Sequence, residues 1–178
     1  MSRFTHLPYE IPTADSGELE ELYAFLGGAV FVAQGLELEI TNLAVGLQAA
    51  GATSLAEGDI SSMFDEKEAK TFGALLSDVR KHALVDAATE AQLRLALSER
   101  NRLVHRFVYE HDDDLLSSAG RREMIEDLRL IIQRFADADA ASSRLCLRLW
   151  ESLGLTQEAI AAGVEAKMVA AAARDITM

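Results

Sequence analysis

The chain has 178 residues, of which 49% are hydrophobic and 26% are charged, so it can form one soluble domain with a real core. Its 29 acidic residues exceed its 17 basic ones, and the net charge of −12 excludes general charge-driven binding to DNA or to a membrane surface. The single cysteine excludes a disulfide framework and any multi-cysteine zinc or iron–sulfur site.

The first 14 residues predict a loosely ordered arm, and residues 15–178 predict one helical domain. The arm contains both prolines of the chain and lacks the apolar stretch of a signal peptide. The proline-free remainder is rich in Ala, Leu and Glu and has few strand signals, which is typical of helices. We therefore expect a cytoplasmic protein in which Cys146 is a small buried residue.

The first predicted helix begins near Asp15 and ends at about Ala50. Asp15 and Glu18 have the spacing of a capping box. The longest uncharged stretch of this helix is the 15 residues Leu22–Leu36, which is shorter than the roughly 20 apolar residues of a membrane span. This stretch favours a helix buried in protein, and a loop is expected over residues 51–64.

The remaining helices are predicted over Asp65–Leu84, Thr89–Tyr109, Arg121–Leu153 and Thr156–Ala173. The segment His111–Gly120 interrupts the helical pattern between the third and the fourth. Short loops between successive helices are typical of antiparallel neighbours. The sequence therefore predicts an all-α fold: an up-and-down antiparallel bundle of four main helices plus a C-terminal helix.

The third predicted helix carries the informative pattern. At about 100° per residue, one apolar arc faces the core; its members are Leu93, Ala96, Leu97, Leu103, Val104, Phe107 and Val108. Arg100 falls in the middle of this arc, where a guanidinium is costly unless it has a partner or reaches an opening. Asn101 and His105 are four residues apart and share a face.

These residue types suit phosphoryl transfer on RNA. His105 would take a proton from a ribose 2′-hydroxyl or donate one to the leaving oxygen. Arg100 would hold the phosphate and stabilise its developing charge, and Asn101 would orient the imidazole or the phosphate. Neither a metal nor another cofactor is needed. The neighbouring residues expected to contact the RNA are Arg94, Ser98, Arg102 and Arg106.

One histidine does not easily serve as acid and base in the same step. A homodimer that brings two copies of the pattern together would solve this problem. The sequence therefore predicts a homodimer with a composite site.

The pattern Arg100-Asn101-x-x-x-His105 resembles the Arg-x4-6-His signature of the HEPN superfamily, in which Asn or another polar residue often follows the Arg. The resemblance implies a helical bundle, commonly dimeric, with the motif in a composite cleft near the dimer axis. Many members are metal-independent ribonucleases of toxin–antitoxin, phage-defence or RNA-processing systems. The resemblance thus implies that Arg100 and His105 are the catalytic pair, with Asn101 assisting.

The resemblance also implies an antitoxin or another regulatory protein as a partner. One branch, whose toxins are paired with nucleotidyltransferase antitoxins, carries a tyrosine two residues after the histidine. Phe107 occupies that position here, and Tyr109 stands four residues after His105. Modification of a motif tyrosine is therefore not implied for this chain.

A non-catalytic interpretation remains open beside the enzymatic one. Arg100 would then pair with a glutamate of the first helix, Glu37 or Glu39, and His105 would be a core or interface histidine. The protein would be a helical dimer that binds a protein partner or a small ligand. The run His111–Asp114 is interpreted as a solvated loop rather than a metal site, since consecutive residues rarely converge on one ion.

Overall fold

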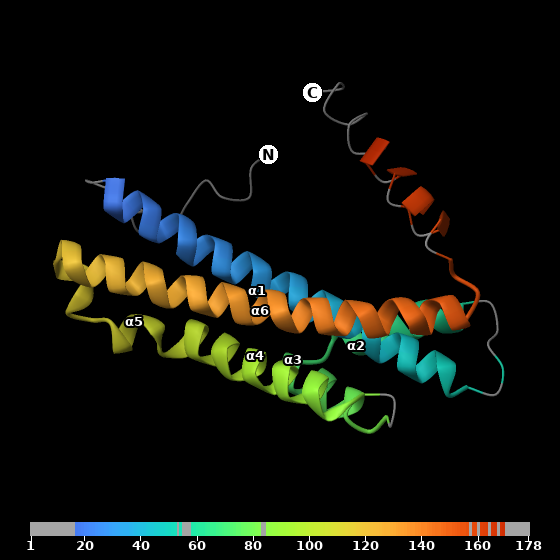
Figure 1. The fold of residues 1–178 in the computed structure, drawn as a ribbon. Coiled ribbons are helices and arrows are strands. Elements are labelled where there is room, and N and C mark those ends of the chain that lie inside the picture. Colours follow the sequence, from blue (N-terminus) through green and yellow to red (C-terminus); the bar gives the residue numbers. More distant parts are fainter. Residues whose placement is uncertain are drawn as a thin grey trace.

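The computed structural model is all-helical over the residues that it describes, which confirms the all-α part of the predicted fold (Figure 1). These residues are 17–52, 54, 58–82, 85–156, 158–159, 161–163, 165–166 and 168–169. The elements are α1 (Gly17–Ala50), α2 (Asp59–Glu68), α3 (Phe72–Val79), α4 (Ala87–His105), α5 (Phe107–Glu110), the 3-10 helix η1 (Asp114–Leu116) and α6 (Ser118–Ser152). The predicted arm over residues 1–14 lies outside the described residues, as does Asp15 of the predicted capping box. Between 158 and 169 the described residues of the predicted C-terminal helix are helical.

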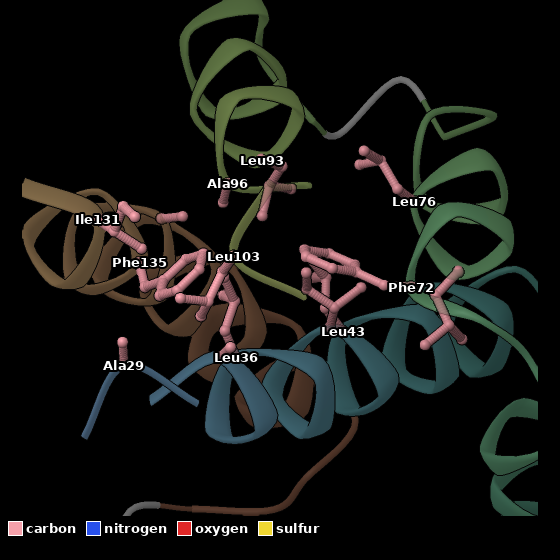
Figure 2. Packing of buried hydrophobic residues seen from close by; sticks show 14 of the residues in the cluster. Ala29, Leu36, Leu43, Phe72, Leu76, Leu93, Ala96, Leu103, Ile131 and Phe135 are labelled. Carbon is pink, nitrogen blue, oxygen red and sulfur yellow. The ribbon is translucent and has the colours of Figure 1, made fainter. Parts of the chain in front are cut away.

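The helices α1 and α6 form the long pair of the fold. They have 34 and 35 residues, and each is about 50 Å long at about 1.5 Å per residue. They run in the same direction, and α4 runs against both (Figure 1). α4 packs on α6, whereas α2 and α3 pack on α1. The core lies where these helices meet, and Figure 2 shows Leu36 of α1, Leu103 of α4 and Phe135 of α6 gathered there.

Within the described residues, α1 is the one helix that is long and apolar enough to cross a membrane by length and composition. Half of its apolar window is buried inside the protein. Ala29, Leu36 and Ile40 are among its fully covered side chains. Such burial is what the sequence leads us to expect of a core helix.

The segment between α1 and α4 differs from the prediction in two ways. The expected loop over residues 51–64 is wrong in its second half, because α2 already begins at Asp59. The expected continuous helix Asp65–Leu84 is also wrong, because α2 ends at Glu68 and α3 begins after Thr71. The Thr71 hydroxyl caps α3 by accepting a hydrogen bond from the Ala74 backbone N–H at 3.3 Å. The break turns Phe72 into the core.

The helix that carries the motif is shorter than predicted. α4 ends at His105, and Arg106 breaks the helix with φ −131° and ψ −23°. Leu93, Leu103 and Phe107 are buried as expected, whereas Val104 and Val108 are 54% and 65% exposed. Glu99, which is paired with Arg134 and Arg102, is buried where the sequence leads us to expect only apolar residues.

A serine cap begins α6 three residues earlier than the predicted start at Arg121. Ser117 has an extended backbone, and its hydroxyl accepts a hydrogen bond from the Gly120 backbone N–H at 3.0 Å. Glu18 of α1 contacts this end of α6 through Arg121 and Ser118.

We expect the Ser117→Ala substitution to lower the free energy of unfolding by about 1 kcal/mol, because it removes the acceptor for a first-turn N–H of α6. Urea denaturation followed by circular dichroism measures this loss. Ser77→Ala, at an exposed position of α3, is the matched control and should change stability by less than about 0.5 kcal/mol. Equal stability of the two variants would contradict the capping role.

Candidate functional site

Arg100 of α4 forms an ion pair with Glu37 of α1. Its Nε donates to Glu37 Oε1 at 2.9 Å, and the two side chains are 32% and 31% exposed. This is one of the two partners that the sequence suggests for a guanidinium in the apolar arc. In the described part of the chain, the terminal nitrogens of the guanidinium have no acceptor, so they can contact a further anion.

The other motif residues lie on the outer side of α4. Arg94, Ser98, Asn101 and His105 are all exposed. Their spacings of four, three and four residues place them in one stripe along the helix. Arg100 and His105 are five residues apart, which separates them by about 140° around the helix axis. The two side chains therefore diverge within one chain.

Arg102 faces α6 rather than solvent. Its Nε donates to Glu110 at 2.6 Å, and its terminal nitrogens contact both carboxylate oxygens of Asp127. These hydrogen bonds, above all those to Asp127, raise the pKa of the guanidinium. Arg102 therefore ties the end of α4 to α6, and the role of phosphate ligand expected from the sequence does not fit its surroundings. Arg106 is exposed and pairs with Glu110 at 3.1 Å.

His111 belongs to the same ion network, although the sequence pattern around it does not indicate this role. Its Nδ1 lies 2.6 Å from Asp114 Oδ2 and its Nε2 lies 2.9 Å from Asp127 Oδ2. The imidazole is 13% exposed and packs against the ring of Phe107 at a centroid distance of 4.7 Å. The prediction of a solvated loop holds for the exposed Asp112 but not for His111.

The network shifts the pKa of His111 and Asp127 in opposite directions. Burial disfavours the charged imidazole, but the hydrogen bonds that it donates to Asp127 and Asp114 outweigh burial and raise the pKa of His111. The hydrogen bond from Arg102 is the main cause that lowers the pKa of Asp127. Protonated His111 therefore stabilises the junction of α5, η1 and α6.

The raised pKa of His111 predicts a pH dependence of stability. Its contribution is fully present below the unfolded-state pKa of about 6.5 and is lost as the pH rises through the higher folded-state pKa. Urea unfolding should therefore show a larger loss of stability from about pH 6 to about pH 9 in the wild type than in His111→Gln. Parallel pH profiles of the two proteins would contradict the role of His111.

An exposed apolar surface borders the Arg100–Glu37 pair; we call it the α1–α4 face. Its members are Val30, Phe31 and Leu38 of α1, Val104 of α4 and Val108 of α5. Val30 stands two turns before Glu37, and Val104 stands one turn after Arg100. Because α1 and α4 run in opposite directions (Figure 1), Val30 and Val104 lie on the same side of the ion pair along the two helix axes. Apolar side chains grouped in this way mark interaction surfaces.

The described residues contain no group of three or more His, Cys, Asp or Glu side chains that could hold a metal ion. No family model, no curated protein and no solved structure matches the chain. The resemblance to the HEPN superfamily stays a prediction from the motif on α4.

Proposed function

We propose that the protein is a HEPN-like, metal-independent endoribonuclease, of the kind that acts in toxin–antitoxin or defence systems. Arg100, Asn101 and His105 are its catalytic residues, and two copies of the chain form each site. The observation that carries the proposal is that one helix presents an exposed imidazole and, five residues before it, a partly exposed guanidinium, beside an apolar face.

The proposed fold is the up-and-down HEPN-like bundle. Its four main helices are α1, the broken α2–α3 segment, α4 and α6, with the C-terminal helix added. The consecutive helices α4 and α6 are antiparallel, as such a bundle requires, whereas α1 and α6, its first and last main helices, run in the same direction and depart from strict up-and-down alternation (Figure 1).

The divergence of Arg100 and His105 supports a site made by two chains. A phosphate held by Arg100 would lie away from the imidazole of the same chain, because the two side chains point about 140° apart around the helix axis. A twofold contact through the α1–α4 face would cover its exposed valines and bring two copies of the motif to one axis. Two imidazoles in one cleft then supply a base and an acid.

In the proposed reaction one His105 imidazole takes the proton of the ribose 2′-hydroxyl, and the 2′-oxygen attacks phosphorus. The bond to the 5′-oxygen breaks, and that oxygen takes a proton from the second imidazole. The products are a 2′,3′-cyclic phosphate and a 5′-hydroxyl. Arg100 neutralises the non-bridging oxygens as charge builds up on them, with the phosphate replacing Glu37 as its partner.

The exposed side chains of Arg94, Ser98 and Arg106 are the proposed contacts to flanking parts of the RNA. Arg102 acts instead by fixing the end of α4. Because the chain is acidic overall, these few cations must act locally. We also propose a cytoplasmic location, with an antitoxin or regulatory protein as partner.

Incubation of the purified protein with single-stranded and structured RNA in EDTA tests the proposal. We expect cleavage without added metal and products with 2′,3′-cyclic phosphate ends. The ion pair of Arg100 with Glu37 favours one alternative, a non-catalytic helical dimer that binds a protein or a ligand. A folded dimer that leaves all these RNAs intact would support this alternative.

A further inference from the structure

A pocket of about 990 Å³ lies between α1, α2, α6 and the segment that follows α6, which lines it with Leu153, Gly154, Leu155, Ala159 and Gly163. Its volume is at the upper end of the range of about 300–1,000 Å³ that is typical of small-molecule sites. Glu39 lines it from α1, whereas Glu37, two residues earlier, turns to the other side of the helix and pairs with Arg100. The pocket is therefore separate from the motif on α4.

Two aromatic rings form part of the pocket wall. Phe64 of α2 and Trp150 of α6 are almost parallel, with an interplanar angle of 4° and ring centroids 6.5 Å apart. The indole lies against α1 at Gly46, where an added Cβ would be 3.4 Å from Trp150 Nε1. An added methyl group would just reach van der Waals contact with the ring, so the indole packs directly on this part of α1.

Glu39 places a negative charge in these apolar surroundings. It is partly buried, and Asn42 Nδ2 donates to its Oε2 at 3.4 Å. Burial is the main cause that raises the pKa of the Cys146 thiol to about 12, and the negative charge of Glu39 is the second cause. No lysine, arginine or histidine among the described residues pairs with Glu39. A partly buried carboxylate without a cation gains most from a ligand that supplies one.

We propose that this pocket binds an organic cation, a ligand with an ammonium or guanidinium nitrogen on an apolar body. Glu39 would accept hydrogen bonds from the nitrogen, and Phe64 and Trp150 would contact the apolar body and the cation through their ring faces. The net charge of −12 favours the approach of such a ligand.

Trp150 is the single tryptophan of the chain, so intrinsic fluorescence reports on this pocket. Three probes of similar size separate charge from shape: phenethylammonium, neutral 2-phenylethanol and anionic 3-phenylpropionate. We expect a saturable fluorescence change with the cation, weaker binding of the alcohol and the weakest binding of the anion. Glu39→Gln should weaken binding of the cation at least about tenfold and leave the alcohol unchanged.

Glu20→Gln, at an exposed position of α1, is the matched control and should bind all three probes like the wild type. Phe64→Leu keeps most of the apolar volume but removes one ring face, so it should weaken binding of the cation more than binding of the alcohol. Circular dichroism establishes that each variant is folded. Equal affinity for the three probes, unchanged cation binding by Glu39→Gln, or no saturable signal from the wild type would each overturn the proposal.

Discussion

Replacement of His105 by alanine should lower the rate of RNA cleavage in EDTA by at least about 100-fold, which is the contribution expected of a general acid–base group. The imidazole is exposed at the last residue of α4, so its removal deletes no core contact. The variant should therefore unfold at the same urea concentration as the wild type. The loss of rate would then reflect chemistry rather than stability.

His82→Ala is the matched control for this prediction. His82 is half-buried in the turn after α3, outside the motif helix, and its replacement should leave the cleavage rate within about threefold of the wild type. Rates are measured with one labelled RNA at equal concentrations of folded dimer. A His105→Ala protein that cleaves as fast as the wild type would remove His105 from the proposed site.

Gly120→Ala should lower the free energy of unfolding by about 3 kcal/mol, at the upper end of the cost of overpacking. A Cβ at this position would lie 2.3 Å from the carbonyl oxygen and 2.4 Å from the Cα of Asp114. Both atoms belong to the backbone of η1, so a rotamer change cannot relieve the clash. Displacement of η1 would also move Asp114 away from His111.

The direction of the stability change shows whether the added methyl group clashes with η1. Glycine to alanine within a helix ordinarily stabilises by about 0.5–1 kcal/mol. Gly28→Ala in α1, where an added Cβ meets nothing within 4 Å, is the control and should show this ordinary gain. Urea denaturation of both variants measures the difference. A Gly120→Ala protein as stable as Gly28→Ala would show that η1 does not pack as described.

The fold class follows from the sequence because helix formers and the absence of proline act locally. The same local signals place the end of α1 at Ala50 correctly. The break between α2 and α3 is different, since Ala69, Lys70 and Thr71 include neither proline nor glycine. The break depends on packing, because it turns Phe72 and Leu76 toward α1 and α4 (Figure 2). A single sequence contains no record of that contact.

The contacts of the motif helix are also predictable from the sequence only in part. A guanidinium in an apolar arc requires a carboxylate, and this reasoning identifies Glu37 as one of two candidate partners of Arg100. The network of Arg102, His111 and Asp127 is not predictable in this way. Asp127 is 25 residues from Arg102 and 16 from His111, so their contact exists only after α4 packs on α6.

The network also explains why the motif helix ends where it does. Arg102 on α4 contacts Glu110 on α5 and Asp127 on α6, which holds the chain on both sides of the break at Arg106. The break leaves His105 exposed at the last residue of α4, directly before Arg106. An imidazole in this position is accessible to a substrate and to a second copy of the chain.

The dependence of cleavage on the fraction of wild-type chains tests the composite site most directly. Wild-type and His105→Ala chains are mixed one to three, exchanged by unfolding and refolding, and assayed at constant total protein. If each site needs His105 from both chains, activity falls with the square of the wild-type fraction, to about one sixteenth. This is the result we predict. Activity of about one quarter, proportional to the wild-type fraction, would show that each chain carries a complete site and would contradict the composite arrangement.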